Sequence, residues 1–153
     1  MRFTLLDKIL ELEPAKRLLA SRYVSPEDDY FLDHFPGNPI VPGVLLVEMI
    51  AQAAGTCVLA GLDRSLWPIF LQIRQANFRK SVLPGSSLLI DYQIETFTHS
   101  TSAAQDKVTQ DNQTMADASL LLGFVPRTVF QPDHRDEMLA DYYKEHPESH
   151  GSV

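Results

Sequence analysis

The chain has 153 residues, of which 44% are hydrophobic and 22% charged, and its 20 acidic and 13 basic residues give a net charge of −7 at pH 7. This length predicts one domain with a single core, and this composition excludes disorder over most of the chain. The acidic balance excludes general nucleic-acid binding, which needs a basic face, and the single cysteine, Cys57, excludes both an internal disulfide and a cysteine-based zinc site.

The N-terminal segment mixes apolar and acidic residues. Asp7, Glu11 and Glu13 lie where a secretory signal would have an uncharged apolar core, so we expect a cytoplasmic protein. Two strands are predicted here, over Ile9–Glu13 and Lys16–Val24.

A loop of 17 residues, Ser25–Val41, follows these strands. Loops of this length without secondary structure are uncommon in compact domains and often carry function. Pro36, Pro39 and Pro42 stiffen this one, because each proline restricts its own backbone and that of the preceding residue. His34 is therefore a titratable side chain on a rigid loop that leads into a helix.

The next segment, Pro42–Gly61, is apolar almost all round and predicts a buried helix. Proline suits the first turn of a helix and glycine its end. An apolar segment of this length could also cross a membrane, but polar residues in its middle argue against membrane insertion. These residues, Glu48, Gln52 and Thr56, are spaced four apart and so form one polar line along the helix.

The rest of the chain predicts an antiparallel sheet, because it alternates apolar and polar residues and has short turns between successive strands. A slip in the phase of the alternation indicates a β-bulge near Arg74–Ala76, and Asp111 and Asn112 suit a tight turn. The predicted strands are Ile69–Arg79, Ser87–Phe97, a polar strand at about 102–110 and Met115–Val125. A sheet wrapped around one buried helix is the architecture that these elements indicate.

Charge is distributed unevenly along the chain. Residues 64–90 hold four basic residues and no acid, whereas residues 132–153 hold six acids and two bases. A run of like charge is usually a solvated face, and a binding surface is the alternative for residues 64–90. From Arg127 onward the sequence turns polar, and Asp133 to Lys144 could form only a short helix without an apolar stripe for packing. We therefore expect one domain over residues 1–128 and an acidic, partly disordered tail over residues 129–153.

The apolar helix and the loop before it bring together three groups that could carry chemistry. His34 could act as a base, and burial of Glu48 would favour its neutral carboxylic acid form, which can donate a proton. The N–H groups of the first helical turn, at Gly43, lack intrahelical partners and can hold a developing oxyanion. Together these groups suit elimination of a β-hydroxyl next to a thioester carbonyl.

Each residue alone also allows a simpler interpretation. His34 could be a loop histidine bonded to nearby backbone, and Glu48 could be bonded at a subunit interface or face solvent. The other histidines lack the spacing of metal ligands, so no metal site is expected.

The residues from His34 to Gly55 form a recognisable motif. Their sequence, HFPGNPIVPGVLLVEMIAQAAG, closely resembles the signature of the FabZ-type β-hydroxyacyl-ACP dehydratases of bacterial fatty acid synthesis. The resemblance extends more weakly to Leu5–Arg17 and Asn77–Gly85, and it covers residues 4–126. It implies an α+β hot-dog fold, in which an antiparallel sheet wraps a long central helix.

The resemblance also implies how the site is assembled. In this family the active sites form between the subunits of a homodimer, which often assembles further into a hexamer, a trimer of dimers. The histidine matching His34 and the glutamate matching Glu48 are catalytic and come from different chains, and the N–H matching Gly43 holds the thioester carbonyl. The further positions assigned to oxyanion or substrate binding are Val44, Phe35 and Gln52.

The implied partner is an acyl carrier protein. Its phosphopantetheine arm carries the substrate, so no other cofactor is expected, and basic residues near the mouth of an acyl tunnel dock this acidic protein. Arg74, Arg79 and Lys80 lie where the resemblance places that docking surface. The chain departs from the family pattern at Asp33, which replaces the glycine usually found before the histidine.

We therefore predict an enzyme, a hydro-lyase that converts β-hydroxyacyl-ACP to trans-2-enoyl-ACP in bacterial fatty acid synthesis or a related acyl or polyene pathway. Glu48 favours plain dehydration, because the related dehydratase–isomerases usually carry aspartate at this position. Two alternatives remain. One is a hot-dog acyl thioesterase, which would have no need of the His34 loop, and the other is a non-catalytic acyl-carrier-binding subunit that keeps the fold.

Overall fold

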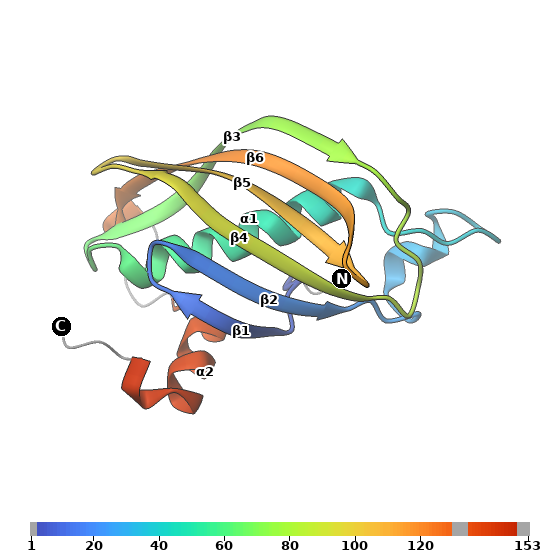
Figure 1. Cartoon of the computed structure of the whole chain (residues 1–153), viewed down its shortest axis with the longest axis horizontal. Coiled ribbons are helices and arrows are strands. Elements are labelled where there is room, and N and C mark those ends of the chain that lie inside the picture. The colour runs from blue at the N-terminus through green and yellow to red at the C-terminus, as the bar shows by residue number, and fades with distance from the viewer. Residues whose placement is uncertain (1–2, 130–134, 150–153) are drawn as a thin grey trace.

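The computed structural model describes residues 3–129 and 135–149. Six antiparallel strands curve around one long helix, α1 (Gly43–Gly61), in the α+β hot-dog arrangement that the resemblance implied (Figure 1). The strands pair in the order β1-β2-β4-β5-β6-β3, so β1 and β3 form the two edges of the sheet. Their bounds are Lys8–Glu13 (β1), Arg17–Tyr23 (β2), Leu66–Phe78 (β3), Ser87–Phe97 (β4), Thr101–Gln110 (β5) and Gln113–Pro126 (β6). The other helices are α2 (Glu137–Glu145) and the short 3-10 turns η1 (Asp29–Leu32), η2 (Arg127–Val129) and η3 (Pro147–Ser149).

The central helix α1 lies against the concave side of the sheet, as Figure 1 shows. It begins at Gly43 with Pro42 as its N-cap, one residue later than predicted, and it ends at Gly61 as predicted. Ten of its residues are buried. By length and composition α1 could cross a membrane, but a core helix passes the same test, and half of its most apolar part is buried inside the fold.

The C-terminal end of α1 is fastened to the turn between β1 and β2. In that turn Ala15 has a φ of 53°, and its N–H donates to the carbonyl of Cys57 at 3.0 Å. A Cβ at Gly61 would collide with the Cβ of Ala15, so the contact requires glycine at this position.

The sheet agrees with the predicted strands to within a few residues at each end, and β4 agrees at both ends. Asp111 and Asn112 have φ of 50° and 61° and make the predicted tight turn between β5 and β6. The bulge expected near Arg74 is confirmed, because the register of β3 against β6 shifts between Ile73 and Gln75. A second shift, between Phe70 and Gln72, was not predicted. Near Phe70 both faces of β3 carry apolar residues, so the alternation of apolar and polar residues in the sequence does not reveal this shift.

The expectation that the acidic C-terminal segment lies outside the fold is wrong for α2. Tyr142 is 8% exposed, and α2 contacts β1 and α1. The hydroxyl of Thr56 on α1 donates to Asp136 Oδ2 at 2.6 Å, and Lys8 on β1 pairs with Glu145 at 2.9 Å. An apolar stripe is present but short: Met138 and Tyr142 lie one turn apart on one face of α2 and pack against the core. Residues 130–134 and 150–153 of the predicted tail lie outside the described residues, so the predicted partial disorder stays a prediction there.

A carboxyl group is buried in the sheet beneath α1. Asp106 lies on β5 at a position that alternates with exposed residues, and it is 3% exposed. Its Oδ1 accepts the N–H of Gln93 at 2.7 Å, but its Oδ2 has no partner among the described residues. Burial raises the pKa of Asp106 to about 8, and the nearby charges of Asp91 and Glu95 add to this rise.

This carboxyl group predicts a stability that falls with rising pH. Because the folded-state pKa lies above the unfolded one, the protonated form stabilises the fold fully below about pH 4, and this contribution is lost as pH rises through 8. Asp106→Asn is neutral at every pH, so at pH 8.5 it should raise the free energy of unfolding by about 2 kcal/mol. Urea unfolding at pH 5 and pH 8.5 measures this.

The matched control is Asp111→Asn, the same substitution at an exposed turn position. It should leave the pH dependence of stability at its wild-type value. An equal dependence on pH in wild type and Asp106→Asn would contradict the prediction.

Candidate active site

His34 lies near the end of the long loop, directly before the residues that lead into α1. Its ring is half-buried and stacks on the ring of Phe35, with 4.1 Å between centroids. Its Nδ1 lies 3.0 Å from the carbonyl oxygen of Ile40, and the Ile40 N–H donates back to the His34 carbonyl at 3.0 Å. Because Nδ1 faces a carbonyl, it carries the ring proton. The lone pair of Nε2 is therefore free to accept a proton.

The N-terminus of α1 is open next to this loop. The N–H of Leu45 already donates to the carbonyl of Pro42 at 2.9 Å, whereas the N–H groups of Gly43 and Val44 precede any possible intrahelical acceptor. The Val44 side chain is 72% exposed. A Cβ at Gly43 would lie 3.0 Å from the ring of Phe78, so glycine keeps this end of the helix accessible beside β3. The geometry suits the binding of a partly negative oxygen.

Glu48 and Gln52 form a bonded pair on the side of α1 that the sheet does not cover. Gln52 donates from Nε2 to Glu48 Oε1 at 3.1 Å and to the carbonyl of Phe3 at 2.9 Å. Its Oε1 accepts the N–H of Leu5 at 2.9 Å. Gln52 therefore orients Glu48 and ties it to the N-terminal segment. Glu48 is half-buried rather than enclosed, so the full burial that the sequence indicated is not reached within one chain.

The polar line predicted on α1 serves two different purposes. Glu48 and Gln52 bond to each other, but Thr56, one turn further on, bonds to Asp136 before α2. Among the described residues, no hydrogen bond joins His34 to Glu48: His34 bonds to Ile40 and Glu48 to Gln52. A single chain therefore presents the two groups without joining them.

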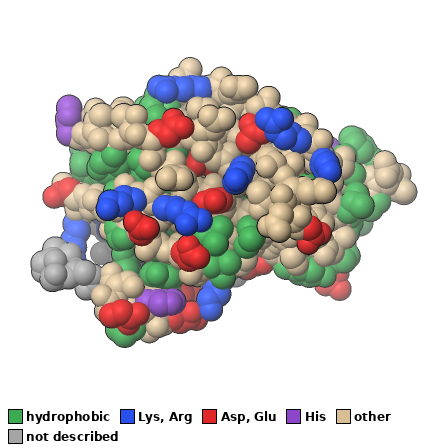
Figure 2. Space-filling model, viewed as in Figure 1, with side chains coloured by type: hydrophobic (Ala, Val, Ile, Leu, Met, Phe, Trp, Pro, Cys, Tyr) green, Lys and Arg blue, Asp and Glu red, His purple; other side chains and the backbone are tan. Residues whose placement is uncertain are grey.

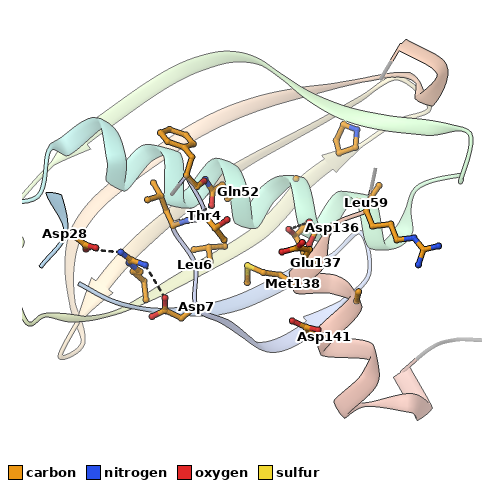
Figure 3. Close-up of a pocket in the computed structure, with 18 of the residues that line it drawn as sticks. Thr4, Leu6, Asp7, Asp28, Gln52, Leu59, Asp136, Glu137, Met138 and Asp141 are labelled. Carbon is orange, nitrogen blue, oxygen red and sulfur yellow. Dashed lines mark hydrogen bonds and ion pairs between the residues drawn. The ribbon is translucent and has the colours of Figure 1, made fainter. Parts of the chain in front are cut away.

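A wide groove of about 1510 Å³ runs along the uncovered side of α1, between the N-terminal segment and α2 (Figure 3). It reaches Gln52, but neither His34 nor Glu48 lines it. Several acidic side chains line the groove, and those labelled in Figure 3 are Asp7, Asp28, Asp136, Glu137 and Asp141. This groove is thus a neighbour of the candidate site and not the site itself.

The three basic residues assigned to docking are exposed, but their surroundings differ from what the sequence indicated. Arg79 pairs through Nε with Asp117 of β6, and this contact lowers the pKa of Asp117. Lys80 donates to the neutral Gln113 at 2.6 Å, and Arg74 stands at the bulge of β3. Residues 64–90 contain no acid, but the fold places Asp117 of β6 beside Arg79. The face shown in Figure 2 mixes Lys and Arg with Asp and Glu.

Sequence reasoning missed a polar group next to the His34 loop. Arg22 on β2 pairs with Asp28 at 2.9 Å, and Asp28 also accepts the hydroxyl of Tyr30 at 2.9 Å. No spacing rule connects these residues, since one lies on a strand and the others in a loop. The sequence offers only one hint of this contact, which is an arginine near the end of a predicted strand followed by a polar loop that could supply an acidic partner.

Comparison with known proteins now decides the family. The family model described as FabA-like domain matches residues 1–119. A FabZ 3-hydroxyacyl-[acyl-carrier-protein] dehydratase of Symbiobacterium thermophilum is 34% identical over 131 residues, which cover 85% of this chain and 92% of that protein. The chain belongs to the FabZ-type dehydratase family. A FabZ of Acetivibrio thermocellus is 37% identical over 127 residues, covering 80% of this chain and 85% of that protein.

Solved structures agree on the fold. The dehydratase heterocomplex of Xenorhabdus doucetiae is 23% identical with a TM-score of 0.60, covering 75% of this chain and 96% of that chain. A mutant thioesterase of Pseudomonas aeruginosa is 18% identical with a TM-score of 0.62, covering 76% and 79%. Because dehydratases and thioesterases share the fold, the fold alone does not separate these activities. The family assignment rests on the sequence match.

Gln52 is expected to stabilise this FabZ-type site by holding the N-terminal segment against α1. Gln52→Ala removes three hydrogen bonds, two of them to the backbone of the N-terminal segment, so it should lower the free energy of unfolding by about 1–3 kcal/mol. Urea denaturation measures this. Gln105→Ala, at an exposed position of β5, is the control and should change stability far less. Equal losses in the two variants would contradict the role of Gln52.

Proposed function

We propose that this chain dehydrates 3-hydroxyacyl thioesters carried on an acyl carrier protein to trans-2-enoyl thioesters. The observation that carries the proposal is the arrangement around the N-terminus of α1. A histidine with its Nδ1 held by a carbonyl stands on one side, an open helix end lies next to it, and an oriented glutamate follows on the same helix. The family match supports the same reaction.

The residues divide the reaction into two proton movements. Nε2 of His34 removes a proton from C2, next to the thioester carbonyl, and the N–H groups at Gly43 and Val44 hold the oxygen that becomes negative. Glu48 in its acid form protonates the hydroxyl on C3, which leaves as water while the C2–C3 double bond forms. A proton then passes from His34 to Glu48 and restores the starting state. Loss of water leaves the net oxidation state unchanged and the two side chains supply both proton transfers, so the proposed reaction uses neither a redox cofactor nor a metal ion.

The chain is proposed to act as a homodimer joined through β3. The two edges of the sheet differ: β1 carries charged residues and is covered by α2, whereas β3 exposes apolar side chains. An apolar, uncovered edge strand is a template for pairing with another strand. The exposed apolar residues of β3 are Phe70, Leu71, Ile73 and Phe78. Pairing here would allow composite sites, since among the described residues no hydrogen bond joins His34 to Glu48 within one chain.

Other parts of the proposal stay predictions. They are the assembly of dimers into a hexamer, the cytoplasmic location and the choice of fatty acid or polyene pathway. Phe35, half-exposed beside His34, is proposed to contact the substrate.

The proposed function predicts the effect of replacing each member of the catalytic pair. His34→Ala and Glu48→Gln should each lower kcat for conversion of 3-hydroxyacyl-ACP to enoyl-ACP by at least about 10³-fold, because each removes one of the two proton transfers. Enoyl absorbance measures turnover. Turnover surviving both substitutions would exclude this mechanism, and release of free thiol without enoyl product would indicate a thioesterase.

Mixing the two inactive variants tests the composite site. If His34 and Glu48 act from different chains, a dimer of one His34→Ala chain and one Glu48→Gln chain has one intact site. Co-expression should then restore about a quarter of wild-type activity, because about half of the dimers are mixed and each has one working site. Each variant co-expressed with itself is the control. No recovery in purified mixed dimers would show that each site lies within one chain.

A separate prediction concerns docking of the acyl carrier protein. Arg74→Glu with Lys80→Glu should lower kcat/KM for an acyl carrier protein substrate by about 10-fold or more but leave a small thioester analogue nearly unchanged, because charge steers only the acidic partner. Arg79 is left in place because it pairs with Asp117. The control is Arg64→Glu, an exposed base in the same segment. Equal losses on both substrates would mean that Arg74 and Lys80 are structural.

A further inference from the structure

Arg22, Asp28 and Tyr30 form a connected network beside the loop of His34. Arg22 donates from Nη2 to Asp28 Oδ2 at 2.9 Å and from Nη1 to Asp7 Oδ1 at 3.2 Å, contacts that Figure 3 draws as dashed lines leading to the two aspartates. The same Oδ2 of Asp28 accepts the Tyr30 hydroxyl at 2.9 Å. The side chain of Arg22 is 13% exposed and that of Asp28 21%. Solvent therefore screens their ion pair less than an exposed one.

The network ends on the backbone that holds His34. Tyr30 belongs to η1, and its carbonyl accepts the N–H of His34 at 3.0 Å and that of Asp33 at 3.4 Å. Tyr30 is thus bound at both ends, by its hydroxyl to Asp28 and by its carbonyl to His34. The carbonyl of Asp28 accepts the N–H of Phe31 at 3.1 Å, which closes the same turn.

His34 is consequently held from both directions along the chain. The carbonyl of Tyr30 fixes its N–H, and Ile40 fixes its ring through Nδ1 and its carbonyl through an N–H. The direction of Nε2 depends on both restraints, because the ring follows the backbone that carries it. A misplacement of about 1 Å in a reacting group can slow a reaction about 10²-fold.

We propose that Arg22, Asp28 and Tyr30 are positioning residues for His34. Arg22 fixes the carboxylate of Asp28, Asp28 fixes the ring of Tyr30, and the Tyr30 carbonyl fixes the backbone of the catalytic histidine. This inference rests on the proposed dehydration. Burial and the hydrogen bond to Asp28 raise the pKa of Tyr30, so its hydroxyl stays protonated and keeps donating at neutral pH.

A purely structural role is the competing explanation. Asp7 accepts both Arg22 and the N–H of Tyr23, so the arginine also joins β2 to the N-terminal segment. A variant that only loosened this junction would lower stability without changing the state of the His34 ring. The test therefore needs a kinetic and a spectroscopic measurement besides stability.

Tyr30→Phe is the most selective change, because it removes one hydroxyl and keeps the ring. We expect kcat for dehydration to fall about 10-fold while KM stays within about twofold, since the hydroxyl orients the base and does not touch substrate. The control is Tyr23→Phe, which removes a hydroxyl from a 52% exposed side chain at the end of β2 and should change neither value. Asp28→Asn repeats the comparison, and replaces it if Tyr30→Phe does not fold.

Nitrogen-15 NMR of the His34 imidazole supplies the second measurement. The wild type should show one tautomer, with the proton on Nδ1, and Tyr30→Phe should show a mixture of tautomers. A wild-type kcat in Tyr30→Phe, or a lowered kcat with an unchanged His34 spectrum, would overturn the inference. The spectrum does not depend on activity, so a wild type without dehydratase activity would contradict the proposed function while the tautomers still test the positioning network.

Discussion

The structure depends on the need to enclose a helix that has almost no polar face. Each large aliphatic side chain taken out of water contributes about 1.5–3 kcal/mol, and ten residues of α1 are buried. The sheet covers one side of α1, and the N-terminal segment and α2 cover part of the other. Because Ala15 must approach Gly61 closely, the turn between β1 and β2 lies at the C-terminal end of the helix. The loop that carries His34 leads into the opposite end, so the proposed base lies beside the N-terminus of α1.

The few polar residues on this helix bond to different parts of the fold. Gln52 joins Glu48 to the backbone of the N-terminal segment, and Thr56 joins the helix to the start of α2. A polar group on a buried helix needs a partner, since leaving it unpaired costs free energy. Asp106 is the contrasting case in the sheet, because one of its oxygens is unpaired among the described residues and burial raises its pKa to about 8.

Segments of opposite charge that are far apart in the sequence are neighbours in the fold. The acid-free segment 64–90 lies on β3 and beyond, where β6 places Asp117 beside Arg79. The acidic C-terminal segment does not stay apart, because α2 packs across β1 and pairs Glu145 with Lys8. One edge of the sheet is thereby charged and covered, while the other is apolar and open. This difference between the edges is the basis for proposing a homodimer that pairs through β3.

Sequence patterns are enough to predict the buried helix, four of the strands to within one residue at each end, and the turn at Asp111 and Asn112. They also identify His34, Gly43 and Glu48 as the candidate residues on the loop and the helix. These follow from short-range patterns: hydrophobic periodicity, prolines, glycines and the spacing of four along a helix. Three features depend on how the chain folds: α2 packs on the sheet and α1, Asp106 is buried without a full set of partners among the described residues, and Arg22, Asp28 and Tyr30 lead to His34. Each of these depends on contacts between residues far apart in the chain or on different elements, and such contacts leave no periodic signal in a single sequence.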